Sequence, residues 1–136
     1  MPSCKPSKRP LLYDEFRKIW VKATPEEIVR QQLLHKMCSE LGYPKELIAV
    51  EKEGIAKRRV DILCYAKNIH PTNLLHPLLL IECKAGFLSQ DALDQAVGYN
   101  HHIGARFVAV ASATGFCLSG FSELPSYETL LNAAKR

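Results

Sequence analysis

The chain has 136 residues, of which 47% are hydrophobic and 24% charged, and its formal net charge is +4. These values are typical of one globular domain, and the absence of any run of about 18 apolar residues excludes a transmembrane helix. The polar segment 1–10 lacks the apolar core of a signal peptide, and the five cysteines include no C-x-x-C pair. We therefore expect a cytoplasmic protein with reduced thiols and no membrane partner.

Residues 1–20 are predicted to form a tail and lead-in, with a short strand within 16–22, and residues 21–136 to form a single domain. The first predicted helix begins at Thr24, which suits the N-cap position. Glu27 stands three residues later and completes a capping box. Apolar residues then recur about every fourth position up to 41, as in an amphipathic helix.

Apolar runs rich in β-branched residues predict strands over 47–53, 60–66, 78–84, 106–112 and 116–118. The first two runs are spaced as a hairpin. Ser89 is a suitable N-cap for a second helix that ends at Gly104, and 126–135 is typical of a closing helix. This order predicts an α/β fold, with a mixed β-sheet of four to five strands flanked by helices.

The strand 78–84 ends in Glu82-Cys83-Lys84. Because side chains alternate along a strand, Glu82 and Lys84 share one face and Cys83 points to the other. Burying ionised groups costs several kcal/mol unless a metal ion, a partner charge or a phosphate compensates. The simpler interpretation is a strand end that emerges into solvent.

Asp61 lies between two apolar residues of the preceding strand, Val60 and Ile62, which can face the core and leave Asp61 on the opposite face. If the strands carrying Asp61 and Glu82 are neighbours, their carboxylates form an oxygen site suited to a hard cation. Glu27 could add a third carboxylate, although its capping-box role explains it equally well.

In the second helix, Gln95 and Tyr99 are four residues apart and share a face. They are candidate site residues, with exposed surface and core as the simpler alternatives. Arg58 and Arg59 precede the Asp61 strand and are placed to meet phosphates, although a solvated hairpin turn explains them as well.

Together these motifs resemble the PD-(D/E)xK nuclease core, with Asp61 followed by Glu82-Cys83-Lys84. The stretch Gln95-Ala-Val-Gly-Tyr99 is similar to the Q-x-x-x-Y motif of some members. The segments 25–31, 58–63 and 94–100 are similar to the N-terminal nuclease domain of type I restriction enzyme R subunits. The resemblance covers about 20–115 and implies a restriction endonuclease-like fold.

The resemblance also implies Mg²⁺-dependent hydrolysis of DNA phosphodiester bonds, with Mn²⁺ as a substitute. On this basis Asp61, Glu82 and the Cys83 carbonyl bind the metal, and Glu27 binds the metal or water. Lys84 is expected to orient or activate the attacking water. Gln95 and Tyr99 would steady the site or contact the DNA, and Arg58 and Arg59 would meet its backbone.

The chain contains no Walker A pattern, G-x-x-x-x-G-K-[ST], so we expect a nuclease domain without a helicase motor. It would act as a stand-alone domain, as a homodimer, or with a separate helicase or other partner subunit. The alternative is a non-catalytic module on the same fold that binds nucleic acid or a partner protein.

Overall fold

A computed structural model describes residues 10–53 and 59–135. Its elements are, in chain order, β1 (Leu11–Asp14), β2 (Ile19–Lys22), α1 (Pro25–Ser39), the 3-10 turn η1 (Lys45–Leu47), β3 (Ile48–Glu53), β4 (Arg59–Lys67), β5 (Leu75–Lys84), α2 (Gln90–Ile103), β6 (Phe107–Ser112), β7 (Gly115–Leu118) and α3 (Tyr127–Ala134). No helix in the described ranges is both long and apolar enough to cross a bilayer.

Five strands form a mixed sheet in the order β3-β4-β5-β6-β7. All neighbours are antiparallel except β5 and β6, which run parallel. Parallel neighbours need a crossover connection, and α2 supplies it. The predicted β3–β4 hairpin and the adjacency of β4 and β5 are confirmed. Strands β1 and β2 form a separate hairpin.

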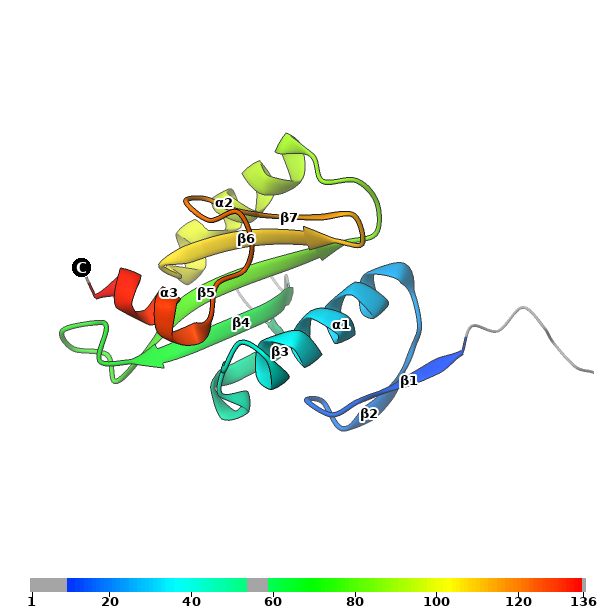
Figure 1. Cartoon of the computed structure of the whole chain (residues 1–136), viewed down its shortest axis with the longest axis horizontal. Helices are drawn as coiled ribbons and strands as arrows, with labels where there is room; N and C mark the ends of the chain where they lie inside the picture. Colours follow the sequence, from blue (N-terminus) through cyan, green and yellow to red (C-terminus); the bar gives the residue numbers. More distant parts are fainter. Residues whose placement is uncertain (1–9, 54–58, 136) are drawn as a thin grey trace, which may run out of the picture.

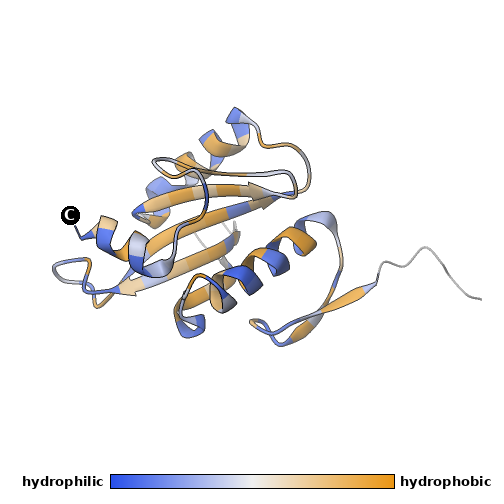
Figure 2. Cartoon of the chain, in the orientation of Figure 1, coloured by the Kyte–Doolittle hydropathy of each residue, from blue (hydrophilic) through white to orange (hydrophobic). Residues whose placement is uncertain are grey.

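Helices α1 and α3 cover one face of the sheet and α2 covers the other, as Figure 1 shows. The central strand β5 is consequently buried on both sides, and residues 78–81 are 0% exposed. This double burial explains why β5 is a continuous apolar run. In Figure 2 the central strands are largely orange, whereas the helices are banded with polar and apolar residues.

The helix boundaries follow the predicted caps. Thr24 accepts a hydrogen bond from the Glu27 N–H at 3.2 Å, and Ser89 accepts one from the Ala92 N–H at 3.1 Å. Helix α2 ends at Gly104, whose φ of 78° lies in the left-handed region. Glycine adopts this conformation without the steric cost that a Cβ atom imposes.

Two elements differ from the sequence prediction. The lead-in forms the β1–β2 hairpin instead of one short strand. Strand β5 starts at Leu75 instead of 78, because its pairing with β4 continues past Pro77 to the Lys67–Leu75 pair. A register shift opposite Cys64 and Tyr65 leaves Leu78 as an extra residue, and such a bulge accommodates a nearby proline.

A substitution in the central strand should lower stability far more than one in the exposed β4–β5 loop. Ile81→Ala removes a 0% exposed side chain from the middle of the core, so the free energy of unfolding should fall by about 2–5 kcal/mol in urea denaturation. Leu74→Ala, at a side chain 71% exposed in the β4–β5 loop, is the control and should change it by about 0.5 kcal/mol or less. Equal losses in the two variants would contradict this placement of the core.

Candidate functional site

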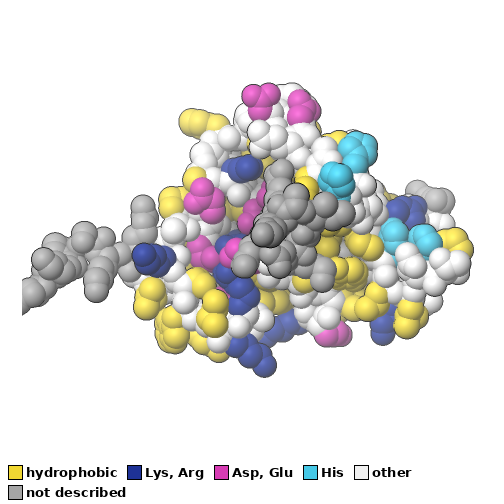
Figure 3. Space-filling model, turned by 180° about the vertical axis from the view of Figure 1, so that it is seen from behind, with side chains coloured by type: hydrophobic (Ala, Val, Ile, Leu, Met, Phe, Trp, Pro, Cys, Tyr) yellow, Lys and Arg dark blue, Asp and Glu magenta, His cyan; other side chains and the backbone are white. Residues whose placement is uncertain are grey.

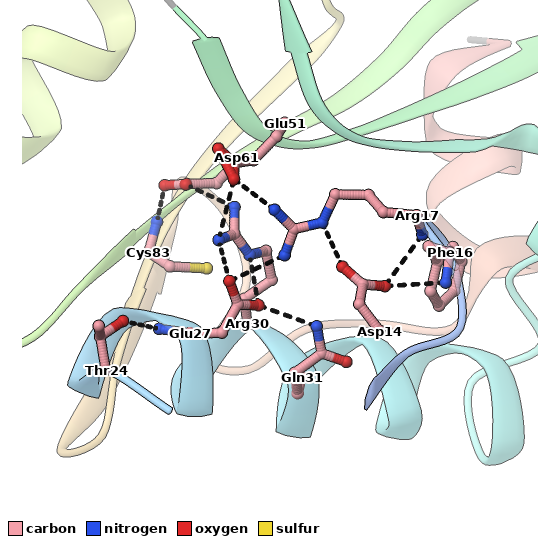
Figure 4. Close-up of polar contacts among 10 residues, drawn as sticks. All are labelled: Asp14, Phe16, Arg17, Thr24, Glu27, Arg30, Gln31, Glu51, Asp61 and Cys83. Carbon is pink, nitrogen blue, oxygen red and sulfur yellow. Dashed lines mark hydrogen bonds and ion pairs between the residues drawn. The ribbon is translucent and has the colours of Figure 1, made fainter. Parts of the chain in front are cut away.

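The candidate site lies where strands β4 and β5 stop pairing. The last main-chain pair at this end is Ile62 with Ile81. One residue further along β4, the Asp61 carboxylate accepts a hydrogen bond from the Cys83 N–H at 2.8 Å (Figure 4). A side chain therefore replaces the main-chain ladder, and it joins Asp61 directly to the Glu82-Cys83-Lys84 segment.

Asp61 also reaches helix α1. Its second carboxylate oxygen accepts a hydrogen bond from Nη1 of Arg30 at 3.1 Å. The neighbours of Asp61 belong to different cores, because Ile62 packs on the α1 and α3 face and Val60 on the α2 face. The prediction that Val60 and Ile62 share one face is therefore wrong, since the strand leaves regular alternation at Asp61.

Arg30 is the central cation of the site, and only 6% of it is exposed. Its Nε donates to Glu27 Oε2 at 3.1 Å and its Nη2 to Glu27 Oε1 at 2.6 Å. The guanidinium thus holds Glu27 in a bidentate pair and Asp61 with its remaining nitrogen. This geometry uses the planar fork that distinguishes arginine from lysine.

A second guanidinium enters from the turn of the β1–β2 hairpin. Arg17 Nη2 donates to Glu27 Oε1 at 2.8 Å, and the other Arg17 nitrogens bond Asp14 and Glu51. Asp14 is fully buried and also accepts the N–H groups of Phe16, at 2.8 Å, and Arg17, at 3.1 Å. The hairpin turn is therefore anchored to α1 and β3 by charge (Figure 4).

Glu51 has an unusual backbone. Its φ is 53°, a left-handed value that non-glycine residues seldom adopt. In β3, Val50 packs on the α1 face and Ala49 on the α2 face, so regular alternation would turn Glu51 toward α2. The left-handed residue instead directs its carboxylate to Arg17 and Arg30.

Hydrogen bonds hold the pKa of Glu27 well below its usual range. Burial alone would raise its pKa, but donors from Arg30, Gln31 and Arg17 outweigh burial and lower the pKa from 4.5 to about 2. The carboxylate is therefore ionised through the whole physiological range, and its oxygens are shared among these three partners.

Of the predicted residues of β5, Cys83 bonds Asp61 through its N–H, and Glu82 and Lys84 flank it in the strand. Ile81 and Cys83 pack on the α1 and α3 face, so Glu82 between them points to the α2 face, where it is 6% exposed. Lys84 is half-buried at the strand end. Burial raises the pKa of the Cys83 thiol, which suits a core residue and not a nucleophile.

The structure separates the predicted α2 pair. Tyr99 is buried in the α2-face core with Val60 and Leu80, whereas Gln95 is exposed. Arg58 lies outside the described residues. Arg59 begins β4, but its side chain is also outside the described part of the chain.

Sequence reasoning missed four charged residues of the site, namely Asp14, Arg17, Arg30 and Glu51. One of them, Arg30, could have been found from the helical pattern of the sequence. Arg30 precedes Leu34 and Met37 at helical spacing on the buried face of α1, and a charge in line with core residues indicates a paired group. We find no comparable signal for the others.

The formal charges of the cluster do not balance. Four carboxylates, those of Asp14, Glu27, Glu51 and Asp61, meet two guanidiniums, which is a formal excess of two negative charges. Within the described ranges no three His, Cys, Asp or Glu side chains are already grouped as metal ligands. Mg²⁺ is commonly held by one or two carboxylates and keeps several waters, so oxygen donors such as Asp61 and Glu82 are chemically suited to it. In this arrangement the Asp61 carboxylate faces α1 and that of Glu82 faces the α2 side, so the two would have to turn toward each other to share an ion.

The layered mixed sheet, with Asp61 and Glu82-Cys83-Lys84 at the ends of β4 and β5, defines a restriction endonuclease-like α/β domain. Residues 25–125 match the family model of the type I restriction enzyme R protein N terminus (HSDR_N), and the chain belongs to this family. The match includes α1, α2 and the five-stranded sheet, but not the β1–β2 hairpin or α3. Among curated proteins, none matches the chain.

The lowered pKa of Glu27 should make the stability of the folded chain sensitive to acid. Its pKa in the folded state lies below the unfolded value, so ionised Glu27 stabilises the fold fully above pH about 4.5, and this contribution is lost as the pH falls toward about 2. Glu27→Gln should lower the free energy of unfolding by about 3 kcal/mol at pH 7, because it breaks a buried ion pair. The difference from wild type should shrink below pH about 4.

Urea denaturation across this pH range measures the effect. Glu26→Gln is the matched control, since Glu26 is the exposed neighbour of Glu27 in the first turn of α1. It should change the free energy of unfolding by about 0.5 kcal/mol or less. A Glu27→Gln deficit that does not depend on pH would contradict the role of ionised Glu27.

Proposed function

We propose that the chain is a metal-dependent DNA endonuclease that hydrolyses phosphodiester bonds. The observation that carries this proposal is the hydrogen bond from the Cys83 N–H to Asp61, which brings the two halves of the motif to one point in a member of a restriction-enzyme family. Double-strand cleavage would need a homodimer, a partner subunit or two successive nicks.

Asp61, Glu82 and the Cys83 carbonyl would hold Mg²⁺, or Mn²⁺ in its place. In an extended strand the N–H and C=O of one residue point to the same neighbouring strand, so the Cys83 carbonyl is directed to the side where Asp61 lies. Bound there, the metal would polarise the phosphate and lower the pKa of a coordinated water.

The ammonium group of Lys84 would place a positive charge beside the reacting phosphate. Its position two residues after Glu82 places it on the same strand face, at the half-buried end of β5. There it would orient the attacking water and stabilise negative charge in the transition state. Exposed Gln95, together with Arg58 and Arg59, would contact the DNA backbone, and buried Tyr99 would support the strand ends through Val60.

Glu27 would join the metal or its water only after Arg17 and Arg30 release its oxygens. In the arrangement described here Glu27 acts through Arg30, which it holds against Asp61. Arg30 would thereby set the orientation of Asp61, as hydrogen-bond partners of metal ligands commonly do.

One observation favours a second candidate function, a non-catalytic module that binds nucleic acid or a partner protein. Arg30 already provides a positive charge to Asp61, and an internal cation can satisfy a carboxylate without a metal. The two functions differ in whether a divalent ion binds at Asp61.

Cleavage of a labelled DNA panel with Mg²⁺ or Mn²⁺ tests the nuclease proposal, with supercoiled, linear, single-stranded and branched substrates. Lys84→Ala and Asp61→Asn should each reduce the cleavage rate by at least about 10²-fold, because they remove a group that acts on the reacting water or its metal. Lys67→Ala, at an exposed lysine at the other end of β4, is the control and should cleave like wild type.

Thermal unfolding with and without Mg²⁺ separates the two functions. A metal-dependent rise in Tm that Asp61→Asn abolishes supports the nuclease site even on a poor substrate. If Lys84→Ala cleaves as fast as wild type, the assignment of Lys84 is wrong. If neither cleavage nor metal stabilisation is seen, the binding module becomes the better description.

A further inference from the structure

The β1–β2 hairpin presents an unusual outer face. Tyr13 pairs directly with Trp20, and Leu11 pairs directly with Lys22. Residues opposite each other in an antiparallel pair share a face, and so do residues two apart in one strand, so these four side chains lie together. All four are exposed, with Leu11 55%, Tyr13 46% and Trp20 64% accessible. Figure 3 shows hydrophobic side chains gathered at this end of the molecule, with basic ones beside them.

The two aromatic rings are held as a pair. Their centroids are 5.3 Å apart and their planes meet at 64°, an edge-to-face arrangement. Such a contact fixes the side chains while it leaves ring surface open to solvent. Exposed aromatic side chains of this kind are the platforms on which unpaired bases stack in proteins that bind single-stranded nucleic acid.

The positive charge of the chain is concentrated toward the N-terminal end of its sequence. Residues 1–22 contain six Lys or Arg and two Asp or Glu, a net charge of +4, which equals the net charge of the whole chain. The remaining 114 residues contain twelve of each sign and are neutral. On the described hairpin, Lys18 and Lys22 are exposed, and Lys22 flanks Trp20 on the aromatic face. A polyanion fits this distribution of charge.

The hairpin also adjoins the candidate site. Arg17 in its turn bonds Glu27, and Trp20 follows Arg17 by three residues. Tyr13 directly precedes Asp14, whose carboxylate bonds Arg17, so the aromatic pair is adjacent in sequence to the point where the hairpin meets the site. A pocket of about 460 Å³ between the hairpin and α1 has Tyr13, Phe16, His35 and Lys45 among its lining residues. Tyr13 therefore borders both the aromatic face and this pocket.

We propose that the outer face of the β1–β2 hairpin binds an unpaired DNA strand. Tyr13 and Trp20 stack on its bases, while Lys18 and Lys22 contact its phosphates. This proposal rests on the proposed function in one respect, namely that the bound DNA strand runs from the hairpin toward the nuclease site. Stacking on the hairpin itself needs no cleavage, so binding and catalysis can be tested separately.

Trp20 makes the test direct, because it is the only tryptophan of the chain. We would titrate the full chain with a single-stranded thymidine oligonucleotide in EDTA, where metal-dependent cleavage cannot occur. Stacking predicts saturable quenching of the tryptophan fluorescence, and the affinity should fall as salt is raised.

Variants measured by anisotropy of the labelled oligonucleotide complete the test. Trp20→Ala and Tyr13→Ala should each weaken binding about tenfold, the loss expected for one base-stacking contact. Lys22→Ala should weaken it less and flatten its salt dependence. Leu74→Ala and Lys67→Ala are matched controls at an exposed apolar and an exposed basic side chain of the opposite end, and they should bind like wild type. Circular dichroism confirms that each variant is folded.

Three results would overturn the proposal. The first is binding by Trp20→Ala and Tyr13→Ala equal to wild type. The second is equally tight binding of a duplex whose ends are closed by hairpin loops, with the same dependence on Trp20, since bases inside a duplex are stacked on both faces. The third is a concentration-dependent dimer that Trp20→Ala abolishes, with no DNA-dependent quenching, which would assign the face to self-association. If the chain cleaves DNA but the hairpin variants bind like wild type, the nuclease proposal holds and the hairpin proposal is wrong. If the hairpin binds the oligonucleotide but no substrate is cleaved, the chain is a DNA-binding protein and the nuclease proposal is wrong.

Discussion

The arrangement of the site depends on one buried cation, Arg30. An isolated guanidinium between a helix and a sheet would cost several kcal/mol, so its position is stable only while carboxylates surround it. Glu27 fixes it from its own helix, and Asp61 fixes it from β4. Through Asp61, which bonds both Arg30 and the Cys83 N–H, the same contact links α1 to the ends of β4 and β5. Helix packing and site geometry therefore have a common physical cause.

The site occupies a defect in the sheet. Main-chain pairing between β4 and β5 ends at Ile62 and Ile81, and β3 takes a left-handed residue at Glu51, opposite Asp61. Two strands thus lose regular alternation at the same level, and each turns a carboxylate toward α1. Backbone strain of this kind costs about 1–3 kcal/mol and persists where surrounding contacts hold it, which here are ion pairs. The apolar core of β5 continues beneath the defect, so the distortion stays local.

The predictable part of the molecule was set by local chemistry. Thr24 and Ser89 indicate where α1 and α2 begin, because their side chains cap the helices. Strand β5 is predictable because a strand buried on both faces is a continuous apolar run. The adjacency of β4 and β5, which carry Asp61 and Glu82, was predicted from the order of the strands and is confirmed by their pairing. Glu51 could not be predicted because its carboxylate reaches the site only through a left-handed backbone that glutamate seldom adopts, and Arg17 could not be predicted because its place depends on a hairpin turn that the sequence does not signal. The hairpin turn uses Lys18 at φ 57°, without the Asn-Gly or Asp-Gly pair that signals a tight turn.

Arg17 gives the hairpin a thermodynamic connection to the site. Its guanidinium is shared by Asp14 of the hairpin, Glu27 of α1 and Glu51 of β3, so the hairpin cannot move away without leaving two site carboxylates short of a counter-charge. A ligand that favours the displaced hairpin would raise the affinity of the carboxylates for a cation. By linkage, a cation at the carboxylates would favour that same ligand by an equal factor. Arg17 lies outside the residues that match the family. Through it, ligand binding at the hairpin and cation binding at the site carboxylates depend on each other.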